Sequence, residues 1–340
     1  MIYRSKAPLR IGLAGGGTDV SPYCDLYGGA ILNATVSLSA YASIELIQEK
    51  QIIVQALDRK EIQTFEHANA LPIDGTLDLL KGVYNRIQRE YKVPETGFRL
   101  STFVDAPAGS GLGTSSTLVV AIIGAFAEML KLPLGDYDIA HLAYEIERNE
   151  LKLAGGRQDQ YAATFGGVNF MEFYEGDKVI VNPLRIRSQY MHELENNLVL
   201  YFTATSRESA TIIKEQVKNV NNKDEKSIEA MHQLKEQARM MKEAMLKGKL
   251  HEIGEILDYG FEQKRKMAAN ISNSNIEEIY ESAKKAGATG GKISGAGGGG
   301  FMIFYCPNNN SYAVKEALLK FGGEVKNYTF TKYGLTSWSV

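Results

Sequence analysis

The chain has 340 residues, of which 44% are hydrophobic and 23% are charged, a composition typical of a folded globular protein. The formal net charge is -2, so the sequence lacks the basic excess that nucleic-acid-binding proteins usually carry. Its apolar runs are shorter than the roughly 20 residues that cross a bilayer, and MIYRSKAPLR at the start lacks the apolar stretch of a signal peptide. Two distant cysteines, Cys24 and Cys306, argue against a disulfide scaffold and a cysteine-based zinc site. We therefore expect a cytoplasmic protein with no nucleic-acid or membrane partner.

Strand and helix patterns alternate along the first 190 residues. Strands are predicted where β-forming residues cluster or alternate with polar ones, and helices where apolar residues recur at helical spacing, as Leu80, Tyr84 and Ile87 do. The expected strands are 4–13, 30–47, 52–57, 98–104, 168–174 and 179–183. The expected helices are 76–92, 118–130 and 136–150, and glycines at 155–156 and 166–167 bracket an expected loop.

The pattern changes after about residue 190. A strand at 198–203 precedes a long polar region, 208–286, which has helical periodicity and methionines at apolar positions, a pattern typical of core packing. The order of elements predicts an α+β fold in two domains, residues 1–190 and residues 191–340. The remaining expected elements are a strand at 301–306, a helix at 312–321 and a strand at 325–330.

The strongest local pattern is PAGSGLGTSS at 107–116, between a strand and an apolar helix. Glycines allow close backbone approach, so successive N–H groups can converge on an anion, and the helix start near Thr114 adds its positive end. The hydroxyls of Thr114, Ser115 and Ser116 can bind a phosphate or Mg²⁺. The segment is not a P-loop, because no lysine follows its glycines. The alternative is a tight turn that binds nothing.

Two further glycine clusters accompany this loop. GAGGGG at 295–300 matches Gly-x-Gly-x-x-Gly, but the dinucleotide fingerprint opens a helix, whereas residues 301–306 predict a strand. We therefore expect this loop to approach another loop or a phosphate, or to be a plain hairpin. LAGGGTD at 13–19 places Asp19 on a flexible loop, where its carboxylate can accept hydrogen bonds from sugar hydroxyls or serve as a solvated turn residue.

Three charged residues could complete a site for phosphoryl transfer, which needs Mg²⁺, positive charge near the γ-phosphate and often a base. Glu147 lies near the end of a predicted helix, and Asp159 lies in the loop bracketed by glycines. Both also fit a solvated helix face and a solvated loop. Arg10 interrupts an apolar strand between Leu9 and Ile11, so it must face solvent, a carboxylate or a cleft.

Taken together, the three glycine regions resemble the motifs of the GHMP kinase family (galactokinase, homoserine kinase, mevalonate kinase and phosphomevalonate kinase). Residues 107–116 are similar to Pro-x-x-x-Gly-Leu-Gly-Ser-Ser-Ala, and residues 292–300 to Lys-x-Ser/Thr-Gly-Ala-Gly-x-Gly-Gly. Residues 10–19 match the galactokinase motif Arg-Val-Asn-Leu-Ile-Gly-Glu-His-Thr-Asp in part. Gly16 and Gly17 replace its Glu-His pair, which argues against galactose as the substrate.

The resemblance implies an ATP- and Mg²⁺-dependent phosphotransferase with an N-terminal domain like ribosomal protein S5 domain 2 and a ferredoxin-like C-terminal domain. Ser115 and Glu147 would bind Mg²⁺, and Asp159 would act as a base or orient the nucleophilic hydroxyl. Arg10 would pair with Asp159 and hold it ionised. The residues expected to bind ATP are Pro107, Gly109, Ser110, Gly111, Leu112, Gly113, Thr114, Ser115 and Ser116. The residues expected to bind the substrate are Gly16, Gly17, Thr18, Asp19, Gly295, Ala296 and Gly297.

Within the family, residues 9–19, 201–207 and 290–300 look most similar to the branch of heptose 7-phosphate kinases and fucokinases. This implies transfer to the anomeric hydroxyl of D-glycero-D-manno-heptose 7-phosphate, giving the 1,7-bisphosphate for nucleotide-heptose synthesis. The alternatives are a fucose or other hexose 1-kinase and, more distantly, an inactive relative that binds sugar and nucleotide. A monomer or homodimer is expected. The basic residues that could hold a substrate phosphate, or could be plain surface charges, are Arg157, Arg207, Lys264 and Arg265.

Overall fold

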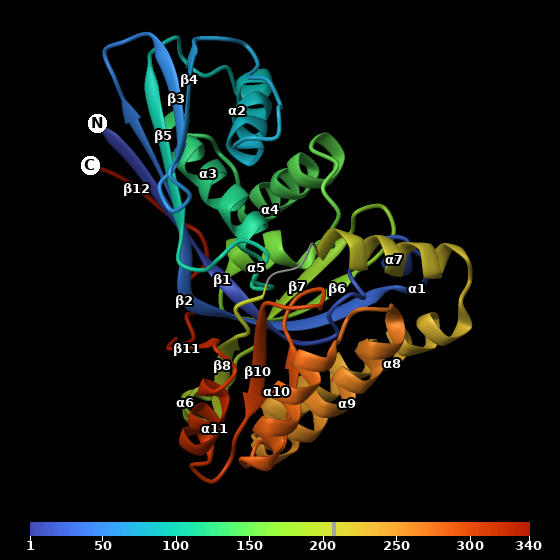
Figure 1. The fold of residues 1–340 in the computed structure, drawn as a ribbon. Helices are drawn as coiled ribbons and strands as arrows, with labels where there is room; N and C mark the ends of the chain where they lie inside the picture. Colours follow the sequence, from blue (N-terminus) through green and yellow to red (C-terminus); the bar gives the residue numbers. More distant parts are fainter. Residues whose placement is uncertain (206–208) are drawn as a thin grey trace.

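The computed structural model describes residues 1–205 and 209–340, which fold around two β-sheets (Figure 1). The first sheet has eight strands in the order β12-β1-β2-β5-β3-β4, with β6 and β7 extending it from β2. Its last strand pairs with its first, so the two chain termini lie close together at one edge (Figure 1). The strands are β1 (Ile2–Ala14), β2 (Gly29–Leu46), β3 (Gln51–Ala56), β4 (Glu61–Glu66), β5 (Phe98–Val104), β6 (Val168–Phe173), β7 (Val179–Pro183) and β12 (Thr336–Ser339).

Helices cover one face of this sheet. The central helix, α3 (Thr114–Leu130), is apolar around its whole circumference and buried from Val119 to Phe126, as expected for a helix enclosed by other elements. It packs against β1 and β2 and against three neighbouring helices. The other helices of this half are α1 (Tyr23–Tyr27), α2 (Asp78–Tyr91), α4 (Asp136–Tyr144), the π-helix η1 (Glu145–Glu150) and α5 (Gln158–Phe165).

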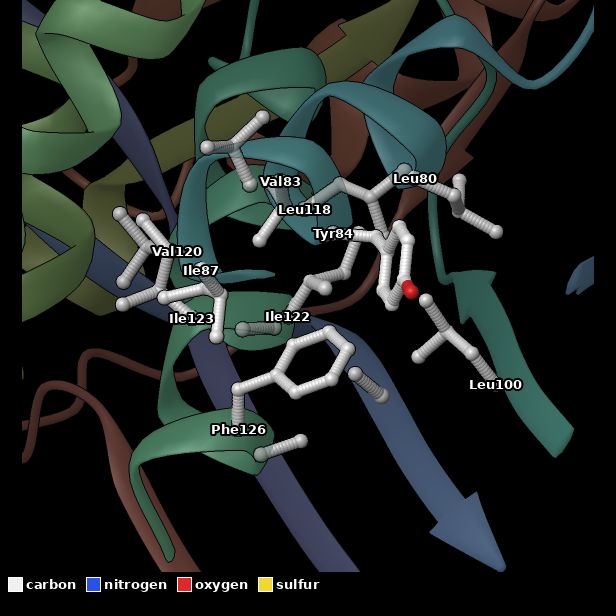
Figure 2. Packing of buried hydrophobic residues seen from close by; sticks show 14 of the residues in the cluster. Leu80, Val83, Tyr84, Ile87, Leu100, Leu118, Val120, Ile122, Ile123 and Phe126 are labelled. Atoms are coloured by element: carbon white, nitrogen blue, oxygen red, sulfur yellow. The ribbon is translucent and has the colours of Figure 1, made fainter. Parts of the chain in front are cut away.

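The core beneath α3 fixes the direction of this helix. Leu118, Ile122 and Phe126 of α3 lie in one buried cluster with Tyr84 and Ile87 of α2 (Figure 2). Burying large apolar side chains stabilises such a contact by about 1.5–3 kcal/mol for each one. The anchored helix therefore presents its first turn at a fixed place, next to the glycine loop that precedes it.

The second sheet has four strands in the order β11-β8-β10-β9 (Figure 1). Its strands are β8 (Leu198–Phe202), β9 (Gly290–Ile293), β10 (Phe301–Tyr305) and β11 (Glu324–Lys326). The remaining helices are α6 (Ser188–Asn197), α7 (Ser209–Asn221), α8 (Glu225–Lys247), η2 (Leu250–Glu252), α9 (Ile253–Met267), α10 (Ser274–Lys285) and α11 (Ser311–Leu319). Of these, α6, α9, α10 and α11 pack against the second sheet, whereas α8 packs against β1 and β2 of the first sheet.

A shared core joins the two sheets. Leu9 and Ile11 of β1 belong to the same buried cluster as Leu200 of β8 and Ile303 of β10. The glycine loops at 107–113 and 294–300 also meet, since the Ser294 hydroxyl donates to the Gly111 carbonyl at 2.9 Å. The mixed helix and strand content confirms the expected α+β class, and the boundary at residue 190 stays a prediction.

Several elements differ from the sequence-based expectation. The expected loop between the glycine pairs is wrong, because most of it forms α5. The strand expected at 325–330 is shorter, and Phe330 instead makes an isolated bridge with Val36. The short strands β4, β9 and β12 were not expected, since four to six residues carry little periodic signal. Within the described part of the chain, every helix is too short or too polar to span a bilayer.

Candidate functional site

A cleft of about 730 Å³ lies where the glycine loops converge. This volume falls within the roughly 300–1,000 Å³ of typical small-molecule sites. Its walls come from the loop before α3, the segment 153–156 with Gln158 and Asp159, the residues Gly17, Asp19 and Val20, the start of α7, Lys264 and the loop at 295–296. Segments far apart in the sequence thus contribute to one site.

The start of α3 lies at one end of this cleft. Gly113 is the N-cap residue with φ of 79°, and no side chain caps the helix. The first N–H groups of a helix have no partner within it, and they carry the positive end of the helix dipole. The neighbouring residues Thr114, Ser115 and Ser116 also line the cleft. This end of the cleft is therefore suited to phosphate groups.

Close packing explains the glycines of the loop. A Cβ atom on Gly111 (φ +84°) would lie 2.4 Å from the carbonyl oxygen of Ser294, and one on Gly113 would lie 3.1 Å from Cγ of Asp159. Only glycine allows the loop to approach both the second glycine loop and the carboxylate. The Ser294 hydroxyl reinforces the contact by donating to the Gly111 carbonyl at 2.9 Å.

The residues expected to bind ATP divide into two groups. Gly109, Gly111, Gly113, Thr114, Ser115 and Ser116 line the cleft, and Pro107, Ser110 and Leu112 are absent from the lining formed by the described residues. Leu112 belongs to the core between the sheets, and the Ser110 carbonyl accepts the Phe301 N–H at 2.8 Å. Ser110 and Leu112 therefore hold the loop in place rather than facing the cleft.

Glu147 sits on a π-helical turn, closed by a hydrogen bond from the Leu151 N–H to the Ile146 carbonyl at 2.9 Å. Such turns are rare and are frequent at functional sites. Glu147 is fully buried. Its carboxylate accepts the Ser115 hydroxyl at 2.7 Å on Oε1 and the Gln160 amide at 2.6 Å on Oε2. The turn therefore brings a carboxylate and a hydroxyl together beside the start of α3.

This pair of oxygens suits Mg²⁺, which usually takes one or two carboxylates and completes its shell with phosphate oxygens and water. Among residues 1–205 and 209–340, no cluster of three or more His, Cys, Asp and Glu side chains could hold a metal. The donor set of Ser115 and Glu147 thus fits an ion that arrives with the phosphates of a nucleotide.

Arg10 and Asp159, which both line the cleft, form an ion pair. The guanidinium of Arg10 contacts Oδ1 of Asp159 through Nε at 2.7 Å and through Nη2 at 2.6 Å. Its Nη1 donates to the Gly111 carbonyl at 2.6 Å. Arg10 therefore faces a carboxylate in a cleft, one of the options that its place in an apolar strand left open. Both contacts use the same carboxylate oxygen, and among the described residues no hydrogen bond involves Oδ2 of Asp159.

Asp159 lies in the first turn of α5, which Asp19 caps. The Oδ2 atom of Asp19 accepts the backbone N–H groups of Arg157 at 2.9 Å and of Gln158 at 3.0 Å. Burial raises the pKa of Asp19, while the Gln158 N–H acts in the opposite direction. Asp19 is only 2% exposed, which contradicts the alternative of a solvated turn residue, and it lines the cleft.

Of the other residues expected to bind the substrate, some line the cleft and some do not. Gly17, Gly295 and Ala296 line the cleft, whereas the cleft walls built by the described residues do not include Gly16, Thr18 or Gly297. The Thr18 hydroxyl lies 2.9 Å from the Gly15 carbonyl oxygen and 3.0 Å from that of Ala30, so it braces the loop internally.

Comparison with known proteins identifies the family of this chain. The family model of the GHMP kinases N terminal domain matches residues 78–167, and that of the GHMP kinases C terminal domain matches residues 241–324. The D-glycero-alpha-D-manno-heptose 7-phosphate kinase of Campylobacter jejuni is 48% identical over 337 residues, which cover 99% of each chain. The chain belongs to the GHMP kinase family. It is a phosphotransferase, and the expected two-domain GHMP kinase fold is confirmed.

Two further relatives show the range of this likeness. The solved structure of a D-glycero-D-manno-heptose 1-phosphate kinase from Bacteroides thetaiotaomicron shares 46% identity and a TM-score of 0.85, over 99% of each chain. A bifunctional fucokinase/GDP-fucose pyrophosphorylase of Arabidopsis thaliana is 26% identical over 88% of this chain, which spans 29% of that protein. The likeness to the fucokinase is therefore more distant.

The basic residues expected to hold a substrate phosphate occupy different environments in this GHMP kinase. Lys264 lines the cleft, with Nζ 3.3 Å from the Gly16 carbonyl oxygen. Burial lowers the pKa of Lys264 to about 8, against the opposing influence of Asp19. Arg265 instead forms a double contact with Glu277 at 2.9 and 2.8 Å, away from the cleft walls formed by the described residues. Arg207 lies outside the described residues.

Sequence reasoning missed three residues of this GHMP kinase site. Gln160 bridges Glu147 and Ser116, with its amide 2.6 Å and 3.1 Å from their oxygen atoms. Lys292 is buried and donates to the Gly12 carbonyl at 2.8 Å, and burial, with the charges of Lys264 and Arg10, lowers its pKa well below the usual range. Arg148 lines the cleft beside Glu147. Each of the three lies in a motif described above or next to a residue expected in the site. This proximity is the only sequence signal that could have identified it.

Proposed function

We propose that this GHMP kinase transfers the γ-phosphoryl group of ATP to the anomeric hydroxyl of D-glycero-D-manno-heptose 7-phosphate. The product would be the 1,7-bisphosphate, a precursor for nucleotide-heptose synthesis. The 48% identity to the Campylobacter jejuni heptose 7-phosphate kinase over nearly the whole chain carries this proposal. The cleft supports it, because an anion-binding helix start and the carboxylate of Asp159 line one space.

The nucleotide phosphates would bind at the start of α3. The N–H groups of the glycine loop and the first turn would donate to the β- and γ-phosphate oxygens, as in other glycine-rich phosphate sites. Ser115 and Glu147 would hold the Mg²⁺ that accompanies the nucleotide, and Mg²⁺ would neutralise charge on the phosphate oxygens. Gln160 would keep the Glu147 carboxylate oriented toward Ser115.

The acceptor hydroxyl would bind at Oδ2 of Asp159. Its oxygen attacks the γ-phosphorus, the bond from that phosphorus to the β–γ bridging oxygen breaks, and ADP leaves. The hydroxyl proton passes to Asp159, which orients the nucleophile even where proton transfer is late. Arg10 holds Oδ1 at 2.7 and 2.6 Å and so fixes which oxygen faces the sugar.

The relatives differ in the position of the phosphate and in the acceptor sugar, and experiments can decide both points. The names of the two heptose kinases place the phosphate at position 7 in one case and at position 1 in the other. The fucokinase likeness favours L-fucose as a second candidate acceptor. The inactive-relative alternative is disfavoured by the intact pairs of Arg10 with Asp159 and of Ser115 with Glu147. The cytoplasmic location and the monomeric or dimeric state stay predictions.

A coupled assay of ADP release tests the proposal. The acceptors are D-glycero-D-manno-heptose 7-phosphate, the same heptose without phosphate, L-fucose, galactose and mevalonate. We expect kcat/KM to be highest for the heptose 7-phosphate. If only L-fucose or another unphosphorylated sugar were turned over, that sugar and not the heptose 7-phosphate would be the substrate. A lack of ADP release with every acceptor would favour a binding protein.

A further inference from the structure

A second cavity of about 260 Å³ adjoins the cleft and shares Asp19 and Arg148 with it. This volume is below the roughly 300 Å³ at which pockets for whole small ligands begin, so it suits one end of a ligand that lies mainly in the cleft. We call it the side cavity. Its walls also include Tyr144, Arg157 and Lys214, so three of its lining residues are cationic and one is acidic.

Arg157 is a structural wall of the side cavity. Its Nη2 atom lies 3.0 Å from a carboxylate oxygen of Asp25 and 3.0 Å from one of Asp177, and its Nη1 donates to the Tyr174 carbonyl at 2.8 Å. Two carboxylates therefore already balance its charge. The side chain is 5% exposed and holds the wall rather than offering a free cation.

Arg148 is held much less tightly. Its Nε lies 3.3 Å from the Gly156 carbonyl oxygen, and its Nη1 lies 3.5 Å from that of Leu153 and 3.6 Å from Oε1 of Glu147. Charge-assisted hydrogen bonds normally measure about 2.7–2.9 Å, so all three contacts are long. Within residues 1–205 and 209–340, no hydrogen bond involves its Nη2. The guanidinium has donors to spare at the border between the cleft and the side cavity.

The lack of a side chain at Gly155 leaves room for the guanidinium of Arg148. A Cβ atom on Gly155 would lie 2.3 Å from Nη2 of Arg148, so any other residue would displace it. Lys214, on α7, also lines the side cavity and is exposed. It forms no ion pair with the rest of the described chain. A guanidinium fork and a flexible ammonium facing one small space are the combination that binds phosphate.

The position of the side cavity relative to Asp159 also suits the far end of an acceptor sugar. Asp19 lines both cavities, and its carboxylate accepts the N–H groups of Arg157 and Gln158, the two residues that precede Asp159. A sugar with its anomeric hydroxyl at Asp159 and its ring along Asp19 would point its far end toward Arg148.

We propose that the side cavity binds the phosphoryl group at the far end of the acceptor sugar, through Arg148 and Lys214. This inference rests on the proposed sugar phosphate substrate and adds where the distal phosphate is recognised. The site would select a phosphorylated acceptor over the same sugar without phosphate.

Direct binding tests this assignment without requiring transfer. Calorimetry without nucleotide compares D-glycero-D-manno-heptose 7-phosphate with the dephosphorylated heptose, in the wild type, R148Q, K214M and the matched control K218M, which changes an exposed lysine one turn along α7. Hydrogen bonds to charged groups contribute about 1.5–3 kcal/mol, so R148Q and K214M should each weaken heptose 7-phosphate binding by roughly 10-fold or more. K218M should match the wild type, and the dephosphorylated heptose should not distinguish the four proteins.

Equal affinity of the heptose 7-phosphate for all four proteins would overturn the assignment, as would no binding at all. An equal loss for both sugars in R148Q would also overturn it for Arg148, because it would show a general disturbance next to Glu147. In steady state, a rise of KM for the heptose 7-phosphate with an unchanged KM for ATP is the expected signature. Binding that follows the expected pattern without any transfer would contradict the proposed function alone.

Discussion

Replacing Asp159 with asparagine isolates the chemical role of its carboxylate. In D159N, the side-chain amide oxygen can still accept from Nε and Nη2 of Arg10, which in the wild type both contact Oδ1 of Asp159, at 2.7 and 2.6 Å. The substitution therefore keeps the position of Arg10 while it removes the negative charge. It also puts an NH₂ donor where Oδ2 would accept the acceptor hydroxyl.

The expected magnitude follows from this geometry. Loss of a positioned acid–base group lowers kcat by roughly 10²–10⁴-fold, which is about 2.7–5.4 kcal/mol of transition-state stabilisation. The nucleotide would bind at the start of α3 rather than at Asp159, so the affinity for ATP should change less than about threefold, well under 1 kcal/mol. Asp159→Ala is a poorer test of this role, because it also removes the carboxylate partner of Arg10. The Arg10 side chain is only 4% exposed and would be left buried and unpaired.

The assay combines steady-state ADP release with the heptose 7-phosphate, calorimetric titration of nucleotide, and thermal unfolding. We expect D159N to bind nucleotide, to keep its unfolding temperature within a few degrees of the wild type, and to lose turnover. A folded D159N protein with kcat within about threefold of the wild type would refute the role of Asp159 and the alignment of the cleft proposed here, since a lost general base costs far more.

Three further predictions concern the metal, the glycine loop and a buried lysine. S115A and E147Q should each raise the Mg²⁺ concentration for half-maximal rate, and unchanged magnesium titrations would remove both as ligands. G111A should lower the free energy of unfolding by more than G176A, because both have positive φ (84° and 68°) but only Gly111 has a backbone atom at 2.4 Å, and chemical denaturation of both variants measures this. The pKa of Lys264 is near 10.5 when unfolded and about 8 when folded, so folding favours its neutral form. Stability should therefore rise by roughly 3 kcal/mol as pH rises through this window, and a wild-type rise equal to that of K264M would contradict the assignment.

The glycine loops were predictable because the pattern of glycines in the sequence indicates the backbone conformation. PAGSGLGTSS at 107–116 follows a strand and opens an apolar helix, and the structure has β5, the loop and α3 in that order. Gly111 and Gly113 require glycine through positive φ and close contacts, a requirement that the sequence records directly. Arg10 was also visible, since a cation inside an apolar strand demands a partner.

The rest of the site depends on contacts that local patterns do not encode. Glu147 is one charge among many on a polar helix, and only the π-turn and the packing of Ser115 and Gln160 bury it. Asp19 has the sequence context of a turn residue, but its carboxylate caps a helix that begins 139 residues later. Helix α5 itself was missed because its apolar residues give almost no amphipathic pattern.

The side cavity was the least visible feature in the sequence. Arg157 is tied to Asp25 and Asp177, whereas Arg148, earlier in the same run of charged residues, faces the cavity with donors to spare. Sequence reasoning could not separate a paired cation from an available one. The difference is set by which carboxylates lie within contact distance after folding.

The position of the new phosphate tests the central claim most directly. The purified protein is incubated with ATP, Mg²⁺ and D-glycero-D-manno-heptose 7-phosphate, and the product is analysed by ³¹P NMR. We expect a second sugar phosphate signal, coupled to the anomeric proton, with the original phosphate at position 7 retained. A product that lacks an anomeric phosphate, with the added group at another hydroxyl, would contradict the proposed alignment of the anomeric oxygen with Asp159.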